Sequence, residues 1–187
     1  MSAHKFTLQK LIERLWIAPE NAEWTPKTTV VPLSELQSWM TSDDIEVLGY
    51  VDSVVHEPRF RIEPPLSTDD YVKWVKHYCG RCFRENPDGE WSDSSYSAGW
   101  ELVRIFIVLW DNETVPRSAL QELKNWIAET YKSADERLRT CIVQATLEHL
   151  FERKPIRHYF SDWKRDAELA KAYREACLWD MITPLSE

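Results

Sequence analysis

Hydrophobic positions recur along most of the chain with the spacing of an α-helix. In the segment 7–18, apolar residues fall at i, i+3, i+4, i+7 and i+8, and Pro19 ends the pattern. Similar spacing, bounded by capping residues and prolines, predicts further helices that begin at Ser34 and Pro155 or cover 67–86, 96–111, 116–132, 133–152 and 167–180. Eight or nine helices with short connections predict an all-α fold, with antiparallel helical hairpins in a bundle or an α-α superhelical stack.

The segment 43–57 has an ambiguous periodicity. It is rich in β-branched residues, which favours a strand, yet most of its apolar side chains share one helical face. We predict a helix that ends before Pro58, although a strand remains an alternative. The residues 58–65 are then an extended connector, and 28–31, within a Pro-rich loop, form a second extended piece.

Two helix starts are predicted from the spacing of a capping box. Ser34 is followed three residues later by Gln37, and Ser133 is followed three residues later by Glu136. In such a box the serine hydroxyl and the later side chain each bond a backbone N–H group that the helix leaves unpaired.

The segment 96–111 is apolar nearly all round, which predicts the buried central helix. Apart from Asp111 at its end, its charged residues are Glu101 and Arg104, which lie one turn apart. Because an unpaired charge is costly to bury, we expect a buried polar cluster at these residues. This cluster is either a salt bridge that fixes helix packing, or a functional site that opens onto a cleft and includes Arg59 or Arg61.

Composition restricts the class of protein. The chain has 187 residues, of which 43% are hydrophobic, and this favours one globular domain. Ten tryptophans and only four glycines favour helix packing over hairpin-rich β folds. A net charge of −8 disfavours nucleic acid as a partner. No apolar run is long enough for a membrane span and residues 1–10 lack a signal-peptide pattern, so we expect a cytoplasmic protein without a membrane partner.

The acidic residues are concentrated in one third of the chain. Between an N-terminal helix with its Pro-rich connector (1–32) and a helical core (97–187), the acidic part (33–96) holds 13 acidic and 6 basic residues. It forms either a solvated face or a surface for a basic protein. Trp91, in a polar loop, either contacts that partner or folds back over the core. The predicted partner-binding residues are Asp69, Asp70, Asp88, Glu90, Trp91 and Asp93.

The motifs that carry chemistry are weak. Cys79 and Cys82 have C-x-x-C spacing, but both fall on an apolar stripe without a second ligand pair, so we expect core thiols and no metal. His158 and Asp162 have the i, i+4 spacing of a helical pair. No phosphate-binding loop, dinucleotide fingerprint or nucleophile elbow is present, so we predict no cofactor and no catalytic residue.

A basic group near the C-terminus is interleaved with acidic residues, which predicts a solvated face of mixed charge. The basic residues are Arg153, Lys154, Arg157, Lys164 and Arg165, and the acidic ones are Glu152, Asp162 and Asp166.

Three segments together resemble a group of uncharacterised bacterial all-helical proteins of similar size. They are residues 91–104 (WSDSSYSAGWELVR), 141–151 (CIVQATLEHLF) and 159–163 (YFSDW). The group has no established activity, so the resemblance implies no catalytic residue. Small acidic helical proteins of this kind are similar to immunity proteins, which implies a cytosolic protein that neutralises a basic toxin domain.

We therefore expect a protein-binding module, most concretely an immunity protein that uses an acidic, Trp-containing surface. One alternative is a small enzyme built around Glu101 and Arg104, with His149 nearby. The other is a helical module that assembles with itself through aromatic residues of 159–163 or through 178–181.

Overall fold

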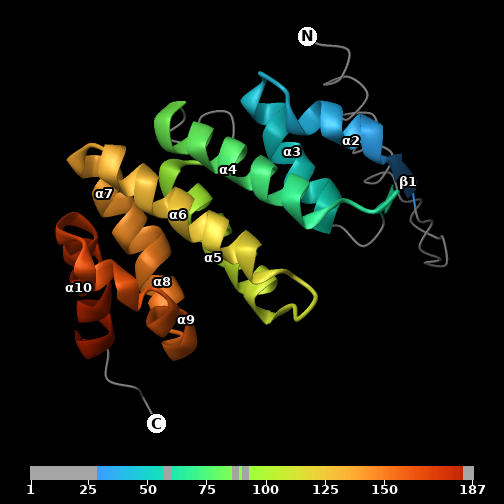
Figure 1. Ribbon diagram of the computed structural model, residues 1–187. Coiled ribbons are helices and arrows are strands. Elements are labelled where there is room, and N and C mark those ends of the chain that lie inside the picture. Colours follow the sequence, from blue (N-terminus) through green and yellow to red (C-terminus); the bar gives the residue numbers. More distant parts are fainter. Residues whose placement is uncertain (1–28, 57–59, 86–88, 90–92, 183–187) are drawn as a thin grey trace, which may run out of the picture. The chain divides into compact units, whose positions relative to one another are not determined.

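The computed structural model describes residues 29–56, 60–85, 89 and 93–182 (Figure 1). These residues are mainly helical and include one two-stranded sheet, so the predicted all-α class is confirmed. The chain divides into two compact units, and the boundary between Trp74 and Val75 lies inside a helix. The predicted single domain stays a prediction, and the helix predicted over 7–18 lies outside the described residues.

The first unit combines helices with a short parallel sheet. Its elements are β1 (Thr29–Pro32), α2 (Leu33–Met40), α3 (Ile45–His56), β2 (Phe60–Glu63) and the first part of α4 (Thr68–Glu85). β1 pairs with β2 in parallel, with Val31 opposite Ile62. The two extended pieces predicted between the prolines thus form one sheet, and α2 and α3 make the crossover that a parallel pair requires.

The helix predicted within 43–57 is confirmed as α3. Its buried residues, Val47, Leu48, Val51 and Val54, share one helical face. The Trp74 indole N–H donates to the Leu48 carbonyl oxygen at 3.2 Å, which ties α4 to this face. Packing of one continuous apolar face therefore outweighs the preference of β-branched residues for strands.

Both predicted capping boxes are wrong. α2 begins directly after Pro32 without a side-chain cap, and Ser34 lies inside its first turn. Pro32 occupies the N-cap position, and its ring holds φ at −60°. Ser133 is the last residue of α6 rather than a cap, and the helix that follows is capped by Asp135, whose carboxylate accepts from the Leu138 N–H at 2.8 Å.

The second unit holds the remainder of α4 and all later elements. They are α5 (Ser95–Asp111), α6 (Arg117–Ser133), α7 (Glu136–Ile142), a π-helical segment (Val143–Leu147), α8 (Glu148–Phe151), α9 (Lys154–Tyr159), a 3₁₀ segment (Ser161–Arg165) and α10 (Ala167–Ile182). α10 packs on α6, the π-helical segment and α8. Fully buried aromatic side chains, including Phe106, Phe151 and Phe160, form the core between these helices.

A π turn lies in the middle of one continuous helix that runs from α7 to α8. At its end the Glu148 N–H donates to the Val143 carbonyl, five residues back instead of four. α5 approaches this segment closely, because a Cβ atom at Gly99 would lie only 2.7 Å from the Ala145 Cβ. Thr146 Oγ1 donates to the Gly99 carbonyl at 3.3 Å. A residue without a side chain is thus required at this contact.

None of the helices in the described ranges is both long and apolar enough to cross a membrane.

Candidate functional site

α5 is less buried than its composition predicts. One side faces the core, but Tyr96, Trp100 and Val108 are 43%, 52% and 48% exposed. With Arg104 they occupy every fourth position of the helix, so the four side chains form a single row. We call Tyr96, Trp100, Arg104 and Val108 the α5 ridge. Of the five large hydrophobic side chains exposed in the described part of the chain, three lie on it.

Side chains of neighbouring elements hold two members of the α5 ridge in place. The Trp100 ring stacks on the His149 imidazole, with ring centroids 3.7 Å apart and an interplanar angle of 29°. The Tyr96 hydroxyl donates to Gln144 Oε1 at 2.8 Å. Gln144 belongs to the π-helical segment and His149 to α8, so the π turn adjoins the row of exposed side chains.

Glu101 and Arg104 form the salt bridge that the sequence predicts as one alternative. Arg104 Nε donates to Glu101 Oε2 at 2.9 Å, and a second guanidinium N–H bonds Glu101 Oε1. The pair lies at the surface, half-buried, and neither residue lines either of the two pockets described below. Arg61 lies in the first unit and pairs with Glu63 at 2.9 Å, while Arg59 is outside the described residues. The pair thus offers no unengaged carboxylate for catalysis.

His149 and Glu148 differ in their electrostatic partners. His149 Nδ1 lies 2.9 Å from Glu152 Oε1. Glu148 makes no ion pair among the described residues, and burial raises the pKa of its carboxyl above the ordinary value, partly offset by the adjacent His149. Folding therefore favours the protonated carboxyl over the charged one. The folded chain loses stability as the pH rises through the raised pKa of Glu148, because the carboxyl then ionises in a partly buried position.

Replacing Glu148 by glutamine is therefore expected to raise the thermal midpoint at neutral pH, because the variant carries no charge to desolvate. The difference from the wild type should vanish near about pH 3, where the carboxyl is protonated in both the folded and the unfolded chain. Thermal unfolding followed by circular dichroism across this pH range measures it. Glu152→Gln, at the exposed neighbouring acid, is the control, and an equal rise in both variants would contradict the explanation.

The predicted partner-binding acids are distributed over both units. Asp69 and Asp70 lie in the first turn of α4 as expected, and the Asp70 N–H donates to the capping Ser67 hydroxyl at 3.1 Å. Hydrogen bonding from Ser67 holds the pKa of Asp70 below its ordinary value. Asp93, in the second unit, accepts from the Tyr78 hydroxyl at 2.7 Å. The other three residues, Asp88, Glu90 and Trp91, lie outside the described residues.

Cys79 and Cys82 are core thiols, as the apolar stripe predicts. Cys79 and Cys82 are fully buried, and the Cys79 thiol lies 3.8 Å from the Ala98 carbonyl oxygen. Burial raises the pKa of the Cys141 thiol to about 11, so this thiol is unreactive at neutral pH. The described part of the chain contains no cluster of three or more His, Cys, Asp or Glu side chains suited to a metal ion.

Lys124 is a buried cation that the sequence analysis missed. It is only 3% exposed, and its ammonium group donates to the Tyr159 carbonyl at 2.7 Å and to Asp162 Oδ1 at 2.5 Å. The predicted pair of His158 with Asp162 is wrong, because a 3₁₀ segment replaces the regular helix there and Asp162 faces Lys124. In the sequence, Lys124 falls on the apolar stripe of α6, and this position could have indicated a buried lysine.

A hydrogen-bonded chain of three side chains in the first unit was also missed. Asp52 lies 2.8 Å from His56 Nδ1, and His56 Nε2 lies 3.1 Å from the Tyr71 hydroxyl. The Asp52 and His56 spacing of four residues was a local signal, but Tyr71 comes from α4. Tyr71 is buried, and this chain links α3 to α4, whereas Asp52 and His56 are partly exposed.

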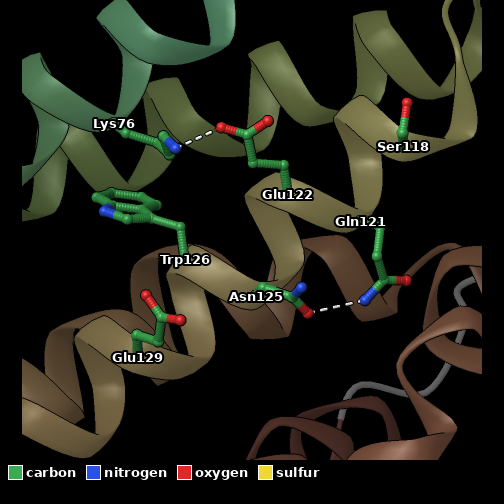
Figure 2. A pocket seen from close by; sticks show the side chains of 7 residues that line it. All are labelled: Lys76, Ser118, Gln121, Glu122, Asn125, Trp126 and Glu129. Carbon is green, nitrogen blue, oxygen red and sulfur yellow. Dashed lines mark hydrogen bonds and ion pairs between the residues drawn. The ribbon is translucent and has the colours of Figure 1, made fainter.

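A shallow pocket of about 390 Å³ lies along α6 (Figure 2). Lys76 pairs with Glu122 at one side, and the Gln121 amide donates to Asn125 at 2.8 Å at the other. The Trp126 ring lies beside Lys76 and stacks on Phe83. The groups can accept a small polar ligand, but they contain no nucleophile paired with a base.

Comparison of the chain with protein-family models, curated proteins and solved structures found no match. The resemblance of three segments to bacterial helical proteins therefore stays a prediction, and no residue role is taken from it.

Proposed function

We propose that this chain is a protein-binding module and that the α5 ridge is its docking surface. The observation that carries the proposal is the row formed by the exposed side chains of Tyr96, Trp100 and Val108 together with the half-buried Arg104. Tryptophan, tyrosine and arginine are the residue types that contribute most to the energy of protein interfaces. A row with four-residue spacing also forms a ridge that fits a groove between side chains of a partner.

The preorganisation of the ridge supports this proposal. Trp100 is stacked on His149, the Tyr96 hydroxyl is bonded to Gln144, and Arg104 is bonded to Glu101. Side chains that are already ordered lose little conformational entropy when a partner docks. They therefore convert contact area into affinity more efficiently than mobile surface side chains do.

Charge favours a basic partner. The chain has a net charge of −8, and Glu148, which precedes the His149 that supports Trp100, makes no ion pair in the described part of the chain. A cation on the partner would compensate this carboxylate. Opposite net charges would also accelerate association, and high salt would weaken this effect.

Trp100→Ala is expected to weaken the complex by about 2 kcal/mol or more, which corresponds to roughly 30-fold in affinity. The physical reason is the loss of the largest exposed apolar side chain of the ridge. Wild type and variant, each immobilised, would be used to capture partners from cells of the source organism at low and high salt. Titration calorimetry with the captured partner then measures both affinities.

A matched pair of valine variants provides the control. Val108→Ala shortens a ridge side chain that is 48% exposed, whereas Val30→Ala makes the same change at a side chain 45% exposed on β1. Only the first should lower the affinity. Equal binding by wild type, Trp100→Ala and Val108→Ala, with all variants folded, would exclude the ridge as the docking surface.

The narrower proposal, an immunity protein that neutralises a basic toxin domain, is decided by the identity of the captured partner. A toxin whose activity is abolished by wild type and restored by Trp100→Ala is the expected result. The self-assembly alternative is weaker for 159–163, since Phe160 and Trp163 are buried in the core. The enzyme alternative is weaker because Glu101 and Arg104 bond each other.

A further inference from the structure

A second pocket, of about 590 Å³, opens beside α10. Three cationic side chains line it, Arg157 from α9, Lys164 from the 3₁₀ segment and Arg174 from α10. None of the described residues that line it is acidic. In a chain with a net charge of −8, this is a local concentration of positive charge.

Three acidic residues near these cations in sequence pair with other groups. Glu152 lies 2.9 Å from His149 Nδ1, Asp162 pairs with Lys124, and Asp166 pairs with Lys132. In the folded chain, these acidic residues are therefore separated from two basic residues of the mixed-charge face that the sequence predicts. Its acids contact other elements, and two of its cations, Arg157 and Lys164, line the pocket.

The pocket also has an apolar wall. Tyr173 is almost completely buried, its hydroxyl donates to the Arg157 carbonyl at 3.3 Å, and the Lys164 ammonium lies 4.8 Å from the centre of its ring. Cys177 and Leu178 continue this wall along α10. The pocket thus combines an apolar surface with cations that lie beside it.

We propose that this pocket binds a small organic anion, in which a carboxylate, sulfonate or phosphate group is attached to an apolar or aromatic body. Lys164 and Arg174 would bind the anionic group, with the Arg174 guanidinium able to make two parallel hydrogen bonds to it. The wall of Tyr173, Cys177 and Leu178 would bury the apolar body. The volume of the pocket lies within the usual range of small-molecule sites.

Cys177 provides a built-in measure of access to this pocket. It is half-buried and lines the pocket, whereas the other three cysteines of the chain are fully buried. Thiol reagents should therefore modify Cys177 selectively in the folded protein. We suggest two aromatic disulfide reagents: dithiobis(nitrobenzoate), whose rings carry carboxylates, and dithiodipyridine, which is uncharged at neutral pH.

Arg174→Ala is expected to slow the reaction of the anionic reagent by about threefold relative to the uncharged one, because one cation a few ångströms away is lost. Lys171→Ala is the matched control: it removes a cation from the same helix, one that lies outside the pocket and pairs with Glu175. The ratio of the two rates should be unchanged in this control. An unchanged ratio in Arg174→Ala as well would overturn the proposal.

Protection by a bound anion tests the proposal independently of the reagent charge. Naphthalenesulfonate should slow modification of wild-type Cys177 by the uncharged reagent, and this protection should be several-fold weaker in Arg174→Ala. Naphthalenemethanol, which has the same apolar body without the charge, should protect little. Equal protection by the two compounds would show an apolar pocket without anion recognition and would overturn the proposal.

Discussion

Gly99→Ala is expected to lower the free energy of unfolding by about 1–3 kcal/mol, the usual cost of overpacking a core. The direction is opposite to that expected from helix propensity, since alanine in place of glycine inside a helix normally stabilises it by about 1 kcal/mol. The reason is the contact of α5 with the π-helical segment, where the new Cβ would lie 2.7 Å from the Ala145 Cβ and 3.1 Å from Thr146 Oγ1. Urea unfolding measures the change.

The structure provides a control and a rescue for this prediction. At Gly80, in α4, a Cβ would meet its nearest atoms at 3.4–3.5 Å, which is ordinary contact, so Gly80→Ala should be neutral or stabilising. Ala145→Gly removes the atom that Gly99→Ala would strike. The double variant should therefore be more stable than the sum of the two single changes predicts. A Gly99→Ala protein as stable as Gly80→Ala would contradict the close approach.

Lys124→Met is expected to lower the free energy of unfolding by about 2–3 kcal/mol, although methionine fills a similar volume. It removes the ammonium group that bonds the Tyr159 carbonyl and Asp162 from a position only 3% exposed. Asp162 is 57% exposed and can regain water, which keeps the cost below that of a fully buried pair. Denaturant unfolding of wild type and variant gives the difference.

Lys132→Met is the matched control for this change. Lys132 lies on the same helix and also pairs with a later aspartate, Asp166, but both side chains of that pair are exposed. Its removal should cost less than about 1 kcal/mol. If both methionine variants were equally stable, burial of Lys124 would contribute nothing beyond a surface pair, and an apolar side chain would serve as well at this position.

The sequence predicts well what depends on local spacing. The helical spacing of Val47, Leu48, Val51 and Val54 predicts α3. Ser67 is confirmed as the N-cap of α4. The two wrong capping boxes show the limit of such patterns. Ser34 and Ser133 have the right spacing, but Pro32 and Asp135 lie at the actual helix starts.

Contacts between distant segments were not predictable from one sequence. The parallel pairing of β1 with β2, the stacking of Trp100 on His149 and the bond from Lys124 to Asp162 each join residues more than twenty positions apart. Local periodicity contains no information on which distant partner a side chain meets. For the same reason the candidate sites moved from the acidic loop around Trp91 to the α5 ridge and the cationic pocket beside α10.

The π turn described above has a consequence for chain length. In a regular helix, positions seven residues apart lie nearly on one face, yet the buried residues Ile142 and Leu150, on either side of the π turn, are eight apart. The π turn accommodates the additional residue and keeps α7 and α8 in phase. Insertions and deletions are ordinarily confined to loops. In this chain the loss of one residue within 143–147 would leave Leu150 and Phe151 facing the core, so the middle of a buried helix is a position where the length of the chain can change.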